Sequence, residues 1–174
     1  MEQQSILLLQ QLHPLVMNYA LDAYSDAITR TPTNVHPVIT QTLRTFAQSD
    51  YLWQLGRTVI NPDGKSAVKP YGNIVTKAKA GQSYHNYGLA LDFAVFEDGK
   101  EEWVEDSNWM IVVDCFKKKG FKWGGDFYGD FKDAPHLEMR PNNINWRDLL
   151  VLHNDSNFIA GTNFVNIKSN SLIA

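Results

Sequence analysis

A short apolar segment, Leu89–Glu97, most constrains what this chain can fold into. Its apolar residues would lie on both faces of an extended strand, as is typical of a strand buried inside a sheet. Residues 97–100, with the sequence Glu-Asp-Gly-Lys, follow at once and place Asp-Gly at the centre of a turn, which favours a β-hairpin. We therefore predict a central antiparallel strand that turns back into a shorter strand at Glu101–Val104.

Helical periodicity prevails in the N-terminal part of the chain. Apolar residues recur at helical spacing from about Ser5 to Ile28, and Pro14 is expected to start or kink a helix there. Residues 31–34, Thr-Pro-Thr-Asn, predict a break, after which Pro37 is expected to open a second helix. The buried side of that helix would comprise Val38, Leu43, Phe46 and Ala47.

Helices and strands alternate in the second half of the chain. One helix is expected to begin at Asp106 or Ser107, and another to span Ile144–His153. Between them, Pro135–Arg140 alternates between two faces as a strand does. One of these faces would carry His136, Glu138 and Arg140. The order of elements predicts an α+β class, with N-terminal helices packed on a small central antiparallel sheet.

Composition and charge fit a single globular domain. The chain has 174 residues, 44% of them hydrophobic, so we predict one domain at 1–153 and a C-terminal tail at 154–174. A net charge of −3 supports neither nucleic-acid binding nor adsorption to anionic membranes. The single cysteine, Cys115, excludes an intramolecular disulfide and is expected to be buried. The N-terminus has neither a signal peptide nor a membrane span, so we expect synthesis in the cytoplasm.

Three residues have side chains that could hold one metal ion. His85 stands before the predicted central strand, Asp92 lies within it, and His136 lies on the later alternating strand. An aspartate in so apolar a strand is costly unless a metal or an arginine compensates its charge, and the strand alone leaves both possibilities open. Two histidines and one carboxylate leave a fourth tetrahedral position for water, as expected of catalytic zinc.

Further residues could serve a zinc-dependent hydrolase. Asp133, three residues before His136, could accept a proton from a zinc-activated water, although it could equally cap the turn before Pro135. Arg44 or Arg57 could stabilise an oxyanion, or either could be an ordinary solvated arginine. The remaining histidines lie near expected helix ends, where structural roles account for them. These are His13, His36 and His153.

The spacing of these residues resembles a known family. Ser83-x-His85-x-x-Gly88-x-Ala90-x-Asp92 resembles a signature of zinc peptidases that cut bacterial cell-wall peptides. That group comprises D-alanyl-D-alanine carboxypeptidases and dipeptidases and L-alanyl-D-glutamate peptidases, and its fold is also seen in Hedgehog signalling domains. Residues 123–127, Trp-Gly-Gly-Asp-Phe, followed by 133–138, are similar to its second signature.

The resemblance extends over residues 8–150 and is closest to L-alanyl-D-glutamate peptidases, which include phage endolysins. The matching segments are Leu43–Thr45, Leu55–Thr58 and Val75–Gly88, whereas Ser49–Trp53 departs from the family pattern. The resemblance implies that His85, Asp92 and His136 bind one Zn²⁺ ion, that Asp133 is the general base and that Arg44 assists the polarised carbonyl. It implies substrate-binding or cleft-shaping roles for Ser83, Trp123, Asp126 and Arg57.

The function expected from this resemblance is hydrolysis of the L-alanyl-D-glutamate bond in peptidoglycan stem peptides. D-alanyl-D-alanine carboxypeptidase or dipeptidase activity is the alternative, and a non-catalytic zinc-stabilised module that binds cell walls is a further one. We expect a monomer without nucleic-acid partners or membrane insertion, and no separate wall-binding domain after residue 154. It would reach the wall by release, for example through a holin pore, or would act on recycled wall peptides.

Overall fold

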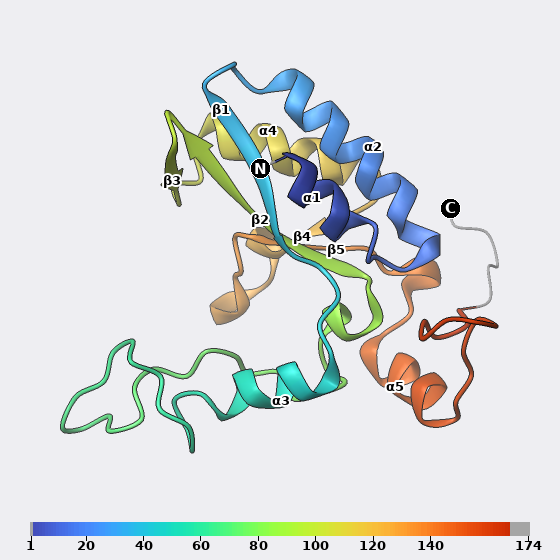
Figure 1. The fold of residues 1–174 in the computed structure, drawn as a ribbon. Helices are drawn as coiled ribbons and strands as arrows, with labels where there is room; N and C mark the ends of the chain where they lie inside the picture. The colour runs from blue at the N-terminus through green and yellow to red at the C-terminus, as the bar shows by residue number, and fades with distance from the viewer. Residues whose placement is uncertain (1, 168–174) are drawn as a thin grey trace. The chain divides into compact units, whose positions relative to one another are not determined.

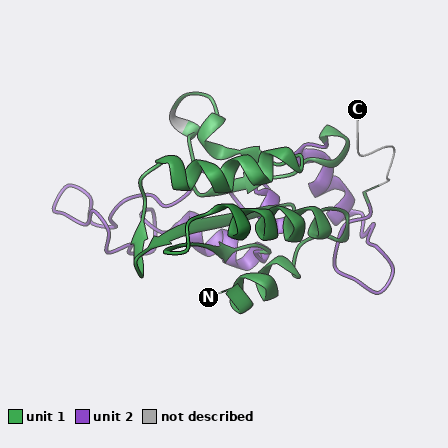
Figure 2. Cartoon of the chain, turned by 90° about the horizontal axis from the view of Figure 1, so that it is seen from above, with its two compact units in different colours: residues 1–43, 88–143, 167–174 green, residues 44–87, 144–166 purple. Residues whose placement is uncertain are grey.

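The computed structural model describes residues 2–167, with only the backbone of residue 130 described. Its chain divides into two compact units, drawn in different colours in Figure 2. Unit 1 comprises Met1–Leu43, Gly88–Asn143 and the C-terminal stretch from Ile167, and unit 2 comprises Arg44–Tyr87 and Ile144–Asn166. Each unit is built from segments that are distant in sequence.

Unit 1 contains the sheet and three α-helices (Figure 1). The strands are β1 (Val35–Gln41), β2 (Ala90–Glu97), β3 (Lys100–Glu102), β4 (Lys122–Trp123) and β5 (His136–Glu138). Their order is β1-β2-β5-β4, with β3 also paired to β2, and every pairing is antiparallel. The helices are α1 (Glu2–Leu9), α2 (Pro14–Arg30) and α4 (Ser107–Lys118). The predicted α+β class is confirmed.

Strand β2 is the centre of the sheet, as its apolar sequence predicts. Its residues from Ala90 to Val95 are buried apart from Asp92, which is half-buried. Asp98 and Gly99 adopt positive φ values of 49° and 78°, the left-handed conformations of the tight hairpin that leads to β3. The sheet therefore places one acidic side chain in the middle of an otherwise apolar strand.

The prediction that a helix begins at Pro37 is wrong, because that segment forms the outer strand β1. Pro37 lies opposite Val95 and Ile39 opposite Phe93 in the β1–β2 ladder. Proline is tolerated on an outer strand, where its missing N–H costs no ladder hydrogen bond, and β-branched neighbours favour the extended chain. The helix begins later, after a capping box at Thr45, as α3 (Phe46–Gln54). Four residues were predicted to form the buried side of the helix from Pro37. Val38 and Phe46 are half-buried, and Leu43 and Ala47 are exposed.

Helices α2 and α4 lie side by side in unit 1 (Figures 1 and 2). Pro14 starts α2, and the Nδ1 atom of His13 caps it by accepting a hydrogen bond from the backbone N–H of Leu15 at 3.1 Å. Asp106 caps α4 as predicted, and Trp109 of that helix packs on Phe93 with ring centroids 4.4 Å apart. Cys115 is buried as expected.

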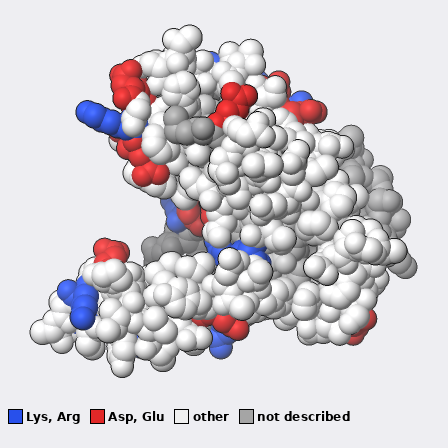
Figure 3. All heavy atoms as spheres, in the orientation of Figure 1, with Lys and Arg blue, Asp and Glu red and all other residues white. Residues whose placement is uncertain are grey.

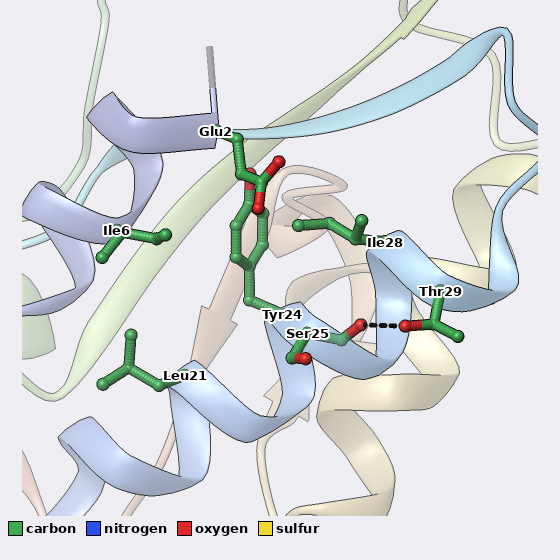
Figure 4. Close-up of a pocket in the computed structure, with 7 residues that line it drawn as sticks. All are labelled: Glu2, Ile6, Leu21, Tyr24, Ser25, Ile28 and Thr29. Carbon is green, nitrogen blue, oxygen red and sulfur yellow. Dashed lines mark hydrogen bonds between the residues drawn. The ribbon is translucent and has the colours of Figure 1, made fainter.

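A pocket opens between α1 and α2 (Figure 4). Within it the hydroxyl of Thr29 donates a hydrogen bond to the carbonyl oxygen of Ser25 at 2.9 Å, as in an ordinary helix turn. Its lining residues are Glu2, Ile6, Leu21, Tyr24, Ser25, Ile28 and Thr29. This lining is largely apolar, with one carboxylate, and it includes none of the predicted site residues.

Unit 2 packs two helices and a short 3₁₀ helix around aromatic rings. These elements are α3, η1 (Tyr84–Tyr87) and α5 (Trp146–Asn154). Phe46 stacks on His153 with ring centroids 4.3 Å apart and meets the edge of Tyr87 at 6.0 Å, so His153 has the structural role expected of it. The long segment at 57–82 is irregular, as predicted.

The region after residue 154 is described as far as residue 167. Phe158 and Val165 form an isolated antiparallel bridge, and Val165 is buried. Residues 168–174 of the expected tail lie outside the described residues, so the division at residue 154 stays a prediction.

Charged side chains on the face drawn in Figure 3 form small groups of both signs.

Among residues 2–167, no helix is both long and apolar enough to cross a membrane.

Candidate metal centre

The pairing of β2 with β5 brings Asp92 and His136 together. The two residues are register partners in this antiparallel ladder. The Nδ1 atom of His136 lies 3.2 Å from Oδ1 of Asp92. A backbone hydrogen bond from the N–H of Phe93 to the carbonyl oxygen of Pro135 at 3.1 Å continues the pairing beyond β5. Strand register alone thus sets two of the three predicted metal ligands opposite each other.

The third predicted ligand, His85, is held by the 3₁₀ helix η1. The backbone N–H of His85 donates to the hydroxyl of Ser83 at 3.4 Å, and Gly88 turns the chain into β2 with a φ of 67°. His85 is buried. His85, Asp92 and His136 each offer one ligand atom, and these three atoms lie within 4.8 Å of one another. The structure therefore brings the three residues together as a group that fits a metal ion.

The electrostatics of His136 favour a positive charge at this place. Burial by itself lowers the pKa of the His136 imidazole, but hydrogen bonds that Asp92 and Glu138 accept from the ring, and the charges of both carboxylates, outweigh burial and raise the pKa to about 9. Two imidazoles and a carboxylate are the donor set of catalytic zinc, with one tetrahedral position left over. A divalent cation fits these residues because it can replace the proton that the carboxylates attract.

Glu138, which was not among the expected site residues, also belongs to this site. Its carboxylate is buried, and Oε2 lies 3.1 Å from Nε2 of His136. Oε1 accepts a hydrogen bond from Nε of Arg140 at 2.6 Å. These two partners lower the pKa of Glu138 although burial alone would raise it. The alternation of Pro135–Arg140 had placed His136, Glu138 and Arg140 on one face, and Glu138 also ends the second family signature; these were the available indications.

The loop that carries Asp133 is fixed through its backbone. The N–H of Asp133 donates to the carbonyl oxygen of Gly124 at 3.1 Å, and the N–H of His136 donates to the carbonyl oxygen of Asp133 at 3.1 Å. The indole N–H of Trp123 donates to the carbonyl oxygen of Ala134 at 2.7 Å. The side chain of Asp133 is exposed. Its role as a base stays a prediction, and its backbone is anchored directly to that of His136.

Replacing Gly124 by alanine is expected to lower hydrolytic activity by about 10²-fold, the order of loss that a 1 Å misplacement can cause. A Cβ atom at Gly124 would lie 2.2 Å from the carbonyl oxygen of Asp133 and 3.0 Å from Cβ of His136, so the Asp133 loop would have to move. Activity of the folded variant on wall peptides measures the effect. Gly161→Ala is the control for backbone strain, since its φ of 75° disfavours alanine while no heavy atom lies within 4 Å of the added Cβ, so it lacks the clash.

The two candidate arginines differ in their surroundings. The backbone N–H of Arg44 donates to the carbonyl oxygen of His85 at 3.0 Å. The buried side chain of Asn86 donates to the carbonyl oxygen of Arg44 at 2.9 Å and to the hydroxyl of Ser49 at 2.8 Å. Arg57 instead places its guanidinium over the ring of Trp53, 4.5 Å from the centroid, and donates to the Trp53 carbonyl oxygen. The backbone links Arg44, and not Arg57, directly to His85.

The residues expected to bind substrate have local partners in the structure. Trp123 is buried and Asp126 is exposed, forming an ion pair with Lys117 at 2.7 Å. Ser83 bonds the backbone of η1 through its hydroxyl. Trp123 and Ser83 thus hold the loops that carry the candidate base and one ligand, and their contact with substrate stays a prediction.

Known proteins resemble this chain in sequence and in fold. The D-alanyl-D-alanine carboxypeptidase family model matches residues 76–139. The peptidoglycan L-alanyl-D-glutamate endopeptidase CwlK of Bacillus subtilis (strain 168) is 44% identical over 140 residues, which are 75% of each chain. The L-alanyl-D-glutamate peptidase of Listeria phage A118 is 39% identical over 61 residues, covering 33% of this chain and 21% of the phage protein.

A solved structure has the same fold. The L-Ala D-Glu endopeptidase ChiX of Serratia marcescens matches with a TM-score of 0.56 and 17% sequence identity, over 80% of this chain and 88% of the other. At this identity the likeness concerns the fold alone, and it confirms the architecture expected from the resemblance in sequence.

Proposed function

Because the chain belongs to the metallopeptidase family of the peptidoglycan L-alanyl-D-glutamate endopeptidases, we propose that it hydrolyses the L-alanyl-D-glutamate bond of peptidoglycan stem peptides. The observation that carries the proposal is the group of His85, Asp92 and His136, whose ligand atoms lie within 4.8 Å of one another in a chain 44% identical to such an enzyme. We propose one Zn²⁺ ion as its cofactor.

The residues of this chain have distinct roles in the proposed reaction. His85, Asp92 and His136 would hold the ion, which when bound supplies Lewis-acid chemistry and lowers the pKa of a water molecule. The carboxylate of Asp133 accepts a proton from the attacking water and delivers it to the leaving amine. The guanidinium of Arg44 donates hydrogen bonds to the oxyanion that forms from the scissile carbonyl.

Arg44, and not Arg57, is expected to act on the oxyanion. Arg44→Met should lower kcat by about 10²-fold or more, the usual cost of removing one oxyanion donor. Arg57→Met should act mainly on KM, since its guanidinium stacks on Trp53. Steady-state kinetics of both variants on one synthetic stem peptide separate these effects. A larger loss of kcat in the Arg57 variant would reverse the assignment.

The bond that is cut is tested by digestion of purified peptidoglycan. Mass spectrometry of the fragments should show new N-terminal D-glutamate, which disappears when the zinc is chelated and returns when zinc is restored. Stem peptides that stay intact in the presence of zinc-loaded protein would refute the proposal.

D-alanyl-D-alanine carboxypeptidase or dipeptidase activity is a second candidate. It is favoured by the family model that matches residues 76–139, which carries the description D-alanyl-D-alanine carboxypeptidase. The same digestion distinguishes the candidates, because this activity releases D-alanine or its dipeptide and leaves the L-alanyl-D-glutamate bond intact. Binding to walls without any cleavage would indicate a non-catalytic module instead.

We further propose that the protein acts as a monomer on peptidoglycan. Light scattering coupled to size exclusion measures its mass in solution against 19.8 kDa for one chain. Its route to the wall, by release through a pore or by action on recycled peptides, is tested by following a tagged protein in cell fractions.

A further inference from the structure

We propose that Glu138 is a positioning residue that orients His136 for metal binding, and that Arg140 holds Glu138 in place. This inference rests on the proposed function, since it concerns a ligand of the proposed zinc ion. All of the side chains on which it depends lie in unit 1, on the adjacent strands β2 and β5 and the residues that follow β5 (Figure 1).

The two nitrogens of the His136 ring have different partners. Nδ1 lies 3.2 Å from Oδ1 of Asp92, which is itself a candidate ligand. Nε2 lies 3.1 Å from Oε2 of Glu138, on the side of the ring away from Nδ1. If Nε2 carries the hydrogen and donates it to Glu138, the lone pair of Nδ1 is available for the metal beside Asp92. When a metal takes the lone pair of Nδ1 beside Asp92, the carboxylate of Glu138 thus favours the tautomer that keeps the hydrogen on Nε2.

The burial of Glu138 indicates that its place is specific. Its side chain is 4% exposed, and a carboxylate so deeply buried is costly unless its charge and both oxygens find partners. The Nε atom of Arg140 donates a hydrogen bond to Oε1 of Glu138 at 2.6 Å, and Nη2 of Arg140 forms a second contact with the same oxygen. Oε2 is left to face His136. Arg140 therefore fixes the carboxylate in the orientation in which its other oxygen meets the ring.

The strand explains why these three residues act together. Side chains two residues apart on a strand lie on the same face, so β5 and the residues after it present His136, Glu138 and Arg140 in a row. A carboxylate on the outer nitrogen of a ligating histidine sets the ring orientation and raises its basicity. Loss of such a partner typically costs about 10–100-fold in metal affinity.

The first test is zinc affinity, measured by competition with a chromophoric chelator. Glu138→Ala should weaken zinc binding by about 10–100-fold. Glu138→Gln should weaken it less, because the amide oxygen still accepts a hydrogen bond from Nε2. Glu101→Gln is the matched control, an exposed carboxylate on strand β3, and should bind zinc like the wild type. Wild-type affinity in a folded Glu138→Ala variant would overturn the proposal.

The second test needs no substitution, so it does not depend on the variants folding. Nitrogen-15 NMR of the imidazoles in the zinc-loaded wild-type protein should show His136 bound to metal through Nδ1 and protonated at Nε2. Coordination through Nε2 would overturn the proposal. Cobalt substitution offers a further readout, because the d–d spectrum of Glu138→Ala should differ from that of the wild type if the ring orientation changes.

The outcomes separate this inference from the proposed function. If the wild type binds zinc and cuts stem peptides while Glu138→Ala keeps its affinity, only the positioning role fails. If the wild type binds zinc but cuts no stem peptide, the proposed function fails and the affinity series still decides the role of Glu138. A wild-type protein that takes up no zinc would overturn both.

Discussion

Asp133→Asn is expected to lower kcat for stem-peptide hydrolysis by about 10²–10⁴-fold, the range that general acid–base catalysis contributes. The substitution preserves the size of the side chain and removes only its ability to accept a proton. The backbone of Asp133 is hydrogen-bonded to Gly124 and His136, so the loop should keep its position in the variant. Zinc affinity should be retained, because Asp133 is not one of the three residues grouped as ligands.

The measurement pairs single-turnover hydrolysis of a synthetic stem peptide with zinc content after dialysis. Asp114→Asn is the matched control, an exposed aspartate on α4 that takes no part in the proposed reaction. An inactive variant that has also lost zinc would point to a ligand or structural role for Asp133. Activity close to that of the wild type would assign the base to another group.

The sequence predicted the ligand group because the types and spacing of its residues indicated metal binding, and local patterns placed Asp92 and His136 on strands. The apolar segment Leu89–Glu97 and the alternation of Pro135–Arg140 each predicted a strand, and pairing of these strands sets Asp92 opposite His136. The exposed and buried faces of a strand follow from its period of two residues. What the patterns could not give was the identity of the neighbouring strand, which depends on contacts between distant segments.

The error at Pro37 has the same physical origin. A proline after a turn predicts the first turn of a helix, yet it is also compatible with an outer strand that needs no N–H at that position. Only the pairing of Pro37 with Val95 in β2 decides between them. The β-branched residues of this segment favour an extended chain, and the long-range pairing with β2 settles the competition in favour of the strand.

The supporting residues of the site were the least predictable. Trp123 was expected to shape the cleft, and the bond from its buried indole to the carbonyl oxygen of Ala134 could not be foreseen from the sequence. Glu138 was visible as one polar residue on an alternating strand and as the end of the second family signature, but its contact with Nε2 of His136 requires side-chain geometry. A motif marks residues whose type the chemistry demands, whereas residues that orient them are recognised from their contacts.

Asp92→Ala is expected to abolish the stabilisation that zinc gives to the wild-type protein. A ligand that binds only the folded state at about 1,000 times its Kd adds about 4 kcal/mol to the free energy of unfolding. For a chain of this size that corresponds to a rise in Tm of roughly 8–16 °C. Asp92 supplies the only carboxylate in the ligand group, so its loss leaves two imidazoles and a much weaker site.

The quantity to compare is the zinc-induced change in Tm, measured by calorimetry with and without zinc for each variant. Asp92→Ala also removes the contact with His136 and will alter Tm without zinc, which is why the absolute Tm does not decide the question. Glu97→Gln is the control, since it changes a carboxylate on the same strand whose register partners are Val35 and Lys100. A zinc-induced rise in the Asp92 variant equal to that of the wild type would remove Asp92 from the ligand set, because a metal can stabilise the fold only through groups that bind it in the folded state.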